Sequence, residues 1–168
     1  NSLLFILTTM VTLNFCTSGA PEKITLRQAK FPAIPPASGE TVQPGLAGPV
    51  SGAYGNFLLV GGGANFENGL PWRGGTKVYH DEIFLMAKNG SGDFVWKQPE
   101  AKLPFPLAYP ACVSTSEGIL SIGGENQEGP VDQVSLFVIR DGQLKTENLP
   151  KLPQPVSSAG ATVIGSNV

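Results

Sequence analysis

Short apolar runs separated by polar turns divide this chain into strands rather than helices. The clearest runs lie at residues 111–115, 119–122, 134–139 and 143–147. Runs of this length, bounded by glycine, proline and small polar residues, are typical of β-strands, and Asp141-Gly142 between the last two is the signature of a two-residue hairpin turn. This part of the chain therefore predicts four consecutive antiparallel strands, here called a, b, c and d.

The same unit occurs more than once along the sequence. Three passages end in an apolar residue followed by proline, at Ile34-Pro35, Leu103-Pro104 and Leu152-Pro153, and each is followed by a segment with the pattern strand, turn, strand. The two complete copies of that second segment end in consecutive glycines. Four-stranded units repeated every 40 to 50 residues or so are typical of propeller blades. The sequence predicts an all-β β-propeller with about two full blades and flanking strands.

A polar insertion interrupts the first of these units. The first two proline motifs are 69 positions apart and the last two are 49 apart, and we assign most of the excess to residues 64–77, between strands b and c. Gly61-Gly62-Gly63 resembles a phosphate-binding loop, but such loops lead into a helix, and the residues that follow are helix-poor. The alternating run at 78–85 predicts one further strand.

The strand predicted at residues 24–28 has the d pattern and precedes every a, b or c strand. It must pair with strands from the far C-terminus, which would close the ring and remove two sheet edges. The sequence stops at Val168 inside an expected b strand, so we expect the propeller of residues 21–168 to be incomplete at its C-terminus.

Residues 1–20 have the pattern of a secretory signal, with an apolar stretch followed by small residues. A buried strand and a short membrane anchor are the alternatives. Cys16 stands where a lipoprotein signal places its modified cysteine, although Asn14 and Phe15 match that signal poorly. We expect an exported protein, periplasmic or lipid-anchored at the cell envelope. Removal of the signal would leave Cys112 as a small buried residue without a disulfide partner.

Composition and charge exclude several classes of function. The net charge of −2 offers no electrostatic surface for nucleic acid or anionic lipid. One histidine and one cysteine after the signal do not supply a usual zinc or copper ligand set, so we expect no metal in this segment. The 21 glycines and 15 prolines suit many short strands joined by turns.

Several residues carry a family resemblance. The run from Gly62 to Phe66, the pairs Pro71-Trp72 and Gly74-Gly75, and the aromatic residues around strands c and d resemble the cyclically permuted kelch-repeat proteins of the N-acetylneuraminate epimerase (sialic acid mutarotase) family. The resemblance implies a six-bladed propeller that interconverts the α and β anomers of N-acetylneuraminate without a cofactor, and homodimerisation is open. It also implies that the catalytic residues lie beyond residue 168, so we expect this segment alone to be inactive.

The loops between strands b and c, and those between d and the next a, should lie on one face of the propeller. We expect the ligand there, and four residues are predicted to bind substrate: Asn65, Arg73, His80 and Glu125. Arg73 could grip a carboxylate through two hydrogen bonds, Asn65 could bind hydroxyl groups, and His80 could transfer protons. These three residues also have structural alternatives: a solvated arginine, a loop-folding asparagine and a histidine bonded within the fold. Glu125 follows the paired glycines of the second unit. Trp72 could stack on a sugar or pack beneath the insertion.

A second function remains open at this level. Propellers host many activities, so a non-catalytic kelch module that binds a glycan or a protein is the alternative to the epimerase.

Overall fold

The computed structural model describes residues 30–43, 45–165 and 167–168. The chain divides into two compact units, Asn1–Lys30 and Phe31–Val168, and only Lys30 of the first unit is described. The signal predicted for residues 1–20, the anchor at Cys16 and the strand at 24–28 all lie outside the described residues. Within the described ranges, no helix is long and apolar enough to cross a membrane.

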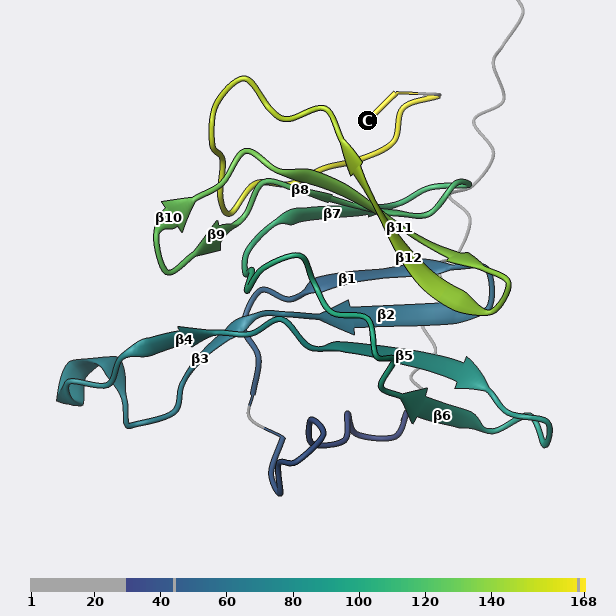
Figure 1. The fold of residues 1–168 in the computed structure, drawn as a ribbon, viewed down its shortest axis with the longest axis horizontal. Helices are drawn as coiled ribbons and strands as arrows, with labels where there is room; N and C mark the ends of the chain where they lie inside the picture. The colour runs from purple at the N-terminus through teal and green to yellow at the C-terminus, as the bar shows by residue number, and fades with distance from the viewer. Residues whose placement is uncertain (1–29, 44, 166) are drawn as a thin grey trace, which may run out of the picture. The chain divides into compact units, whose positions relative to one another are not determined.

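Two four-stranded antiparallel sheets form the body of the Phe31–Val168 unit (Figure 1). Each sheet pairs its strands in the order a, b, c, d along the chain, as the sequence predicts. The first blade consists of β1 (Val50–Tyr54), β2 (Phe57–Gly61), β5 (Ile83–Lys88) and β6 (Phe94–Lys97). The second consists of β7 (Ala111–Ser114), β8 (Ile119–Ile122), β11 (Val134–Arg140) and β12 (Gln143–Leu149).

The hairpin predicted at Asp141-Gly142 is confirmed. Arg140 pairs with Gln143 across a two-residue turn, and both turn residues have positive φ, 54° for Asp141 and 73° for Gly142. Two positive φ angles match the right-handed twist of the flanking strands, which is why aspartate followed by glycine is favoured there.

The single strand predicted at 78–85 is wrong, because two strands occupy that region. A ribbon of β3 (Ala64–Phe66) and β4 (Lys77–Tyr79) leaves the first blade, and its tip carries a 3-10 turn, η1 (Pro71–Arg73). Residues 80–82, between β4 and β5, belong to no strand, although His80 N donates to Gly63 O and Glu82 O accepts from Gly62 N. The carbonyl groups of His80 and Asp81 accept hydrogen bonds from the connection that follows β6. A smaller ribbon of β9 (Glu125–Asn126) and β10 (Gly129–Pro130) takes the same place in the second blade. No α-helix occurs among the described residues.

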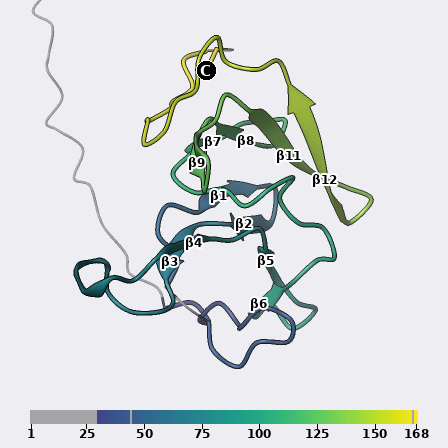
Figure 2. The same ribbon diagram turned by 60° about the vertical axis from the view of Figure 1, so that its left-hand side comes forward.

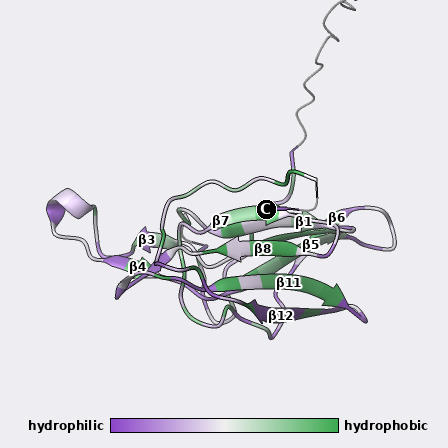
Figure 3. Cartoon of the chain, turned by 90° about the horizontal axis from the view of Figure 1, so that it is seen from above, coloured by the Kyte–Doolittle hydropathy of each residue, from purple (hydrophilic) through white to green (hydrophobic). Residues whose placement is uncertain are grey.

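The hydrophobic core lies between the two blades, which are stacked as layers (Figure 2). Alternation along each strand directs one apolar set to the other blade, and the connection after β6 adds Leu103 and Leu107. In Figure 3 the central strand β11 is mostly hydrophobic, whereas the outer strand β12 and the ribbon strand β4 are hydrophilic. Each fully buried aliphatic side chain contributes about 1.5–3 kcal/mol. The buried cluster comprises Val50, Leu59, Ile83, Leu85, Leu103, Leu107, Ile119, Phe137 and Leu144.

The opposite side of the first blade is covered by the segment at 31–43. The Phe31 and Phe94 rings meet edge to face at 4.9 Å, and the Trp96 indole nitrogen donates a hydrogen bond to the carbonyl of Pro32 at 2.8 Å. Phe84 and Met86 on that side of the sheet are 2% and 4% exposed. The segment at 31–43 therefore covers one face of the first blade, as the connection at 98–110 covers one face of the second.

Paired glycines follow strand b in both blades. Gly62 and Gly123 have φ of 63°, and the glycines after them, Gly63 and Gly124, have φ of 94° and 107°. The amide of the second glycine in each pair donates to the next connection, at Leu107 O (2.8 Å) or Val156 O (2.7 Å). A left-handed backbone favours glycine, and the chain that packs against these glycines leaves no room for a side chain.

A second repeated contact links the starts of successive strands a. The Tyr109 amide donates to Gly48 O at 2.7 Å, and the Ser158 amide donates to Tyr109 O at 2.9 Å. The φ angles are 58° at Gly48, 54° at Tyr109 and 57° at Ser158, so the three residues occupy equivalent positions in the repeat.

These equivalences locate the extra residues of the first unit more closely than the sequence did. Fourteen positions separate Ile34 from Gly48, whereas six separate Leu103 from Tyr109, so eight extra residues lie in the connection before β1. The stretch from Gly62 to Glu82 is ten residues longer than the equivalent stretch from Gly123 to Gln133. The remaining two extra residues lie between strand c and the proline motif that follows it. The assignment of the excess mainly to the b to c insertion is therefore corrected, because that insertion holds half of it.

We predict that Gly62→Ala strongly destabilises the fold. A Cβ at this position would lie 2.4 Å from Leu107 O and 2.6 Å from a Leu103 methyl carbon, and the left-handed backbone adds roughly 1–2 kcal/mol. We expect the free energy of unfolding, measured in urea, to fall by about 2 kcal/mol or more. The matched control is Gly90→Ala, which has open space around its Cβ and should change the value by less than about 0.5 kcal/mol. Equal effects of the two substitutions would contradict this account of the paired glycines.

Candidate functional site

The b to c ribbons and the blade-to-blade connections meet at one end of the unit, as predicted (Figure 1). Backbone hydrogen bonds join them: Leu107 N donates to His80 O at 3.1 Å, and Ala108 N donates to Glu125 O at 2.9 Å. One connection thus contacts the ribbons of both blades. We call this end of the unit the rim.

The β3–β4 ribbon presents different chemistry on its two faces. Directly opposite residues of an antiparallel pair share a face, and successive residues alternate. Lys77 pairs with Phe66 and Tyr79 pairs with Ala64, so these side chains share one face. Asn65 lies on the other, where its Oδ1 is 3.0 Å from His80 Nε2. The ribbon therefore separates the predicted pair Asn65 and His80 from Lys77 and Tyr79.

On the Lys77 face, three side chains converge on the carboxylate of Glu125 in the second blade. Lys77 Nζ and the Tyr79 hydroxyl donate to Oε1 at 2.9 and 2.8 Å, and the Ser157 hydroxyl donates to Oε2 at 2.9 Å. Hydrogen bonds from Lys77 and Tyr79 hold the pKa of Glu125 below its usual value. The hydrogen bond to Glu125 raises the pKa of Lys77, and burial raises the pKa of Tyr79. We call these four residues the Glu125 cluster.

Tyr109 completes the surroundings of this cluster. Its ring lies 4.9 Å from Lys77 Nζ and against Gly48, where an added Cβ would approach Tyr109 Cδ1 to 2.4 Å. A bulky residue rarely adopts the left-handed backbone found at Tyr109. Lys77 is thus held between the rings of Tyr79 and Tyr109 while it bonds Glu125. The cluster fixes the ribbon of the first blade to the rim of the second.

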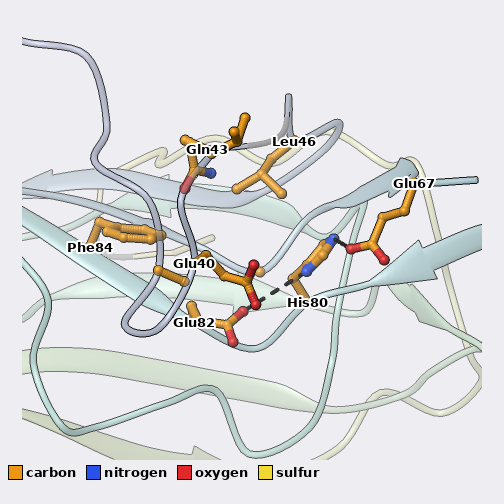
Figure 4. A pocket seen from close by; sticks show the side chains of 10 residues that line it. Glu40, Gln43, Leu46, Glu67, His80, Glu82 and Phe84 are labelled. Atoms are coloured by element: carbon orange, nitrogen blue, oxygen red, sulfur yellow. Dashed lines mark ion pairs between the residues drawn. The ribbon is translucent and has the colours of Figure 1, made fainter.

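The opposite face of the ribbon borders a cavity of about 370 Å³ (Figure 4). His80 stands in its wall, 17% exposed, with Nε2 3.9 Å from Glu67 Oε1 and Nδ1 4.0 Å from Glu82 Oε2. Figure 4 shows the carboxylates of Glu40 and Glu82 on the same side of the cavity as the imidazole. We call this the His80 cavity.

A second cavity, of about 610 Å³, lies along the ribbon toward Tyr109. Its wall combines the apolar side chains of Leu46, Phe66 and Leu70 with the polar ones of Asn65 and Lys77. Mainly apolar walls with a few polar groups are typical of small-molecule sites.

Arg73 and Trp72 lie on η1, at the tip of the ribbon, and both are exposed, with Trp72 76% exposed. None of the ion pairs found among the described residues involves Arg73. The structure therefore brings Asn65 and His80 together, places Glu125 on the opposite side of the ribbon and sets Arg73 apart at the tip. Their contacts with substrate stay predictions.

The sequence analysis did not identify Lys77, Tyr79, Ser157, Glu40 or Glu82 as rim residues. For Lys77 and Tyr79 the sequence did hold a signal, because residues two apart in a strand have side chains on the same face. Only the fold brings Ser157 to Glu125 and Glu40 to the cavity beside His80.

The lone cysteine expected after the signal is described by the structure. Cys112 lies in β7, partly buried against the core, and burial raises the pKa of its thiol. Among the described residues, no group of three or more histidine, cysteine, aspartate or glutamate side chains is arranged to hold a metal ion.

We predict that Glu125→Gln lowers stability in a pH-dependent manner. The depressed pKa of Glu125 means that its contribution is present above the ordinary glutamate pKa of about 4.3 and is lost as pH falls through the folded value. At pH 7 the free energy of unfolding should fall by roughly 1–3 kcal/mol.

Urea unfolding at pH 7 and at successively lower pH checks this expectation. The difference in the free energy of unfolding between the unsubstituted protein and Glu125→Gln should narrow on acidification. The control is Glu128→Gln, because Glu128 is an exposed residue of the same ribbon. A gap of constant size across the series would show that the charge of Glu125 is unimportant.

Comparison with known proteins supports a family relationship over part of the chain. The N-acetylneuraminate epimerase of Salmonella enteritidis PT4 is 40% identical over 121 residues, which cover 66% of this chain and 30% of the relative. The N-acetylneuraminate epimerase of Vibrio vulnificus is 40% identical over 105 residues, covering 57% of this chain and 26% of the relative. The chain thus spans about 30% of the length of these relatives, and no family model matches it.

Among solved structures, YjhT matches with a TM-score of 0.52 and 27% identity over 67% of this chain and 33% of its own. The all-β, kelch-type fold class predicted from the sequence is confirmed by this match and by the antiparallel sheets. In sequence and in fold, this chain is therefore similar to part of the N-acetylneuraminate epimerases, as the glycine-rich and aromatic motifs predicted.

Proposed function

We propose that the protein containing this chain interconverts the α and β anomers of N-acetylneuraminate and that the rim takes part in binding this sugar acid. The observation that carries the proposal is the 40% identity to N-acetylneuraminate epimerases over 121 residues. That match covers 30% of the relative, so the activity is proposed for the whole protein.

The reaction requires proton transfer at two oxygens. A base removes the proton of the anomeric hydroxyl group, an acid protonates the ring oxygen as the ring opens, and closure on the other face reverses these steps. The Glu125 carboxylate is a weak candidate for the base, because three donors already bond it and its pKa is lowered. The residues described here are better suited to binding and orienting the sugar, and the acid and base are expected in other blades.

The rim offers groups suited to a hydroxylated acid. Asn65 and His80 lie together on one face of the ribbon, the larger cavity has apolar walls beside Lys77, and Arg73 stands at the exposed tip. A guanidinium can bind a carboxylate through two parallel hydrogen bonds. We propose Arg73 as the carboxylate contact, and Glu125 as a residue that keeps the ribbon in place near the substrate.

We predict that Arg73→Ala weakens binding of N-acetylneuraminate by roughly 1.5–3 kcal/mol, the range for a hydrogen bond to a charged group. Arg73→Lys should recover only part of this loss, because an ammonium group lacks the two-pronged geometry. Titration calorimetry measures the affinity, and thermal unfolding should be unchanged because Arg73 is exposed. Unchanged affinity in both variants would remove Arg73 from the site.

We also predict that the full-length protein containing this chain accelerates anomer exchange of N-acetylneuraminate, followed by NMR after a sialidase releases the α anomer. The increase in the exchange rate above the uncatalysed rate should be proportional to the protein concentration. Tight glycan binding with exchange at the uncatalysed rate would instead support the non-catalytic kelch module.

A further inference from the structure

The His80 cavity is built by the two parts of the first unit that exceed the repeat. The longer connection before β1 provides Glu40, Gln43 and Leu46, and the longer b to c stretch provides Glu67 and His80. Both expansions therefore border one space, at the end of the blade where the connections gather. Loops held by a rigid β-scaffold are a common location for binding residues.

The polar groups of this cavity are mainly hydrogen-bond acceptors. Glu40, Glu67 and Glu82 supply three carboxylates, and His80 lies between two of them. Lys102 lies 3.5 Å from Glu82 Oε1 but bonds Asp81 more closely, at 2.8 Å. The carboxylates thus outnumber the positive groups around the cavity.

This charge pattern disfavours the carboxylate of a sugar acid and favours its hydroxyl groups. Like charges repel, and the carboxylate of a ligand placed among these three glutamates would lose its hydration without gaining a partner. Hydroxyl groups, in contrast, donate to carboxylates, and such charge-assisted hydrogen bonds are stronger than neutral ones.

The remaining wall suits the carbon chain of a polyol better than a bare cation. Phe84 and Leu46 contribute apolar surface, and Ala37 and Val42 extend it. A hydroxylated carbon chain buries its CH groups against such surface, whereas a cation gains nothing from it.

We propose that the His80 cavity binds the neutral, hydroxylated side chain of the sugar acid, with Glu40 and Glu82 accepting hydrogen bonds from its hydroxyl groups. This inference rests on the proposed function and adds the orientation of the substrate. The carboxylate end of the ligand lies away from the three glutamates.

The test combines protein variants with two ligands. One ligand is N-acetylneuraminate, and the other is the analogue in which the hydroxylated side chain is shortened to a hydroxymethyl group while the ring and the carboxylate are kept. Glu40→Ala is the main variant, since Glu40 is exposed and the change should leave the fold intact, which urea unfolding verifies. Glu82→Ala is the second variant, and Glu100→Ala, an exposed glutamate on the connection after β6, is the control.

Each cavity variant should raise the Kd for N-acetylneuraminate by about tenfold or more. The Kd for the shortened acid should change little, because the hydroxyl groups that meet the glutamates are missing. The control should bind both ligands as the unsubstituted protein does.

Three results would overturn the inference and leave the proposed function standing. Equal losses for both ligands would place Glu40 and Glu82 away from the side chain. Tighter binding of N-acetylneuraminate by Glu40→Ala would place the carboxylate in the cavity, and binding of putrescine that depends on Glu40, with no loss for the sugar acid, would assign the cavity to a cation. If the unsubstituted protein binds neither acid, the proposed function fails together with this inference.

Discussion

The hydrogen bond between the second glycine of each pair and the connection that follows is the contact on which the rest of the structure depends. It fixes the end of strand b against the chain that leads into the next blade, at Gly63 with Leu107 and at Gly124 with Val156. The same connection places Leu103 and Leu107 in the core. Backbone geometry and apolar burial therefore act at one place, and a side chain on the first glycine of the pair would disturb both.

These backbone contacts and buried side chains recur in the repeat, whereas the rim residues differ between the two blades. The second blade has only the small β9–β10 ribbon after its glycine pair, whereas the first blade has a longer ribbon with two chemically distinct faces. One face attaches to Glu125 of the neighbouring blade, and the other borders the His80 cavity. A stable attachment on one side lets the opposite side keep its polar groups in a defined position.

Much of the fold follows from the sequence alone. Strand order, the hairpin at Asp141-Gly142 and the clustering of connections at one end were predictable, because they depend on local turn chemistry and on alternation. The break between β4 and β5 was not predictable, because the carbonyl groups of His80 and Asp81 accept hydrogen bonds from a connection that is distant in sequence. Within the site, proximity of Asn65 and His80 follows from the ribbon register, which the sequence did not reveal. The Glu125 cluster depends on contacts across 32 to 48 positions and could not be predicted from local pattern.

The backbone contacts that run from Gly48 to Tyr109 to Ser158 have a consequence for how such a protein can diversify. Amide and carbonyl groups make these contacts, so each position requires a left-handed backbone rather than a particular side chain, except that Gly48 packs against the Tyr109 ring and leaves no room for a Cβ. Gly48, Tyr109 and Ser158 differ in chemistry yet share one backbone conformation. Mutation can therefore change the recognition chemistry of the rim while these backbone contacts persist, so that substrate preference and architecture can evolve separately.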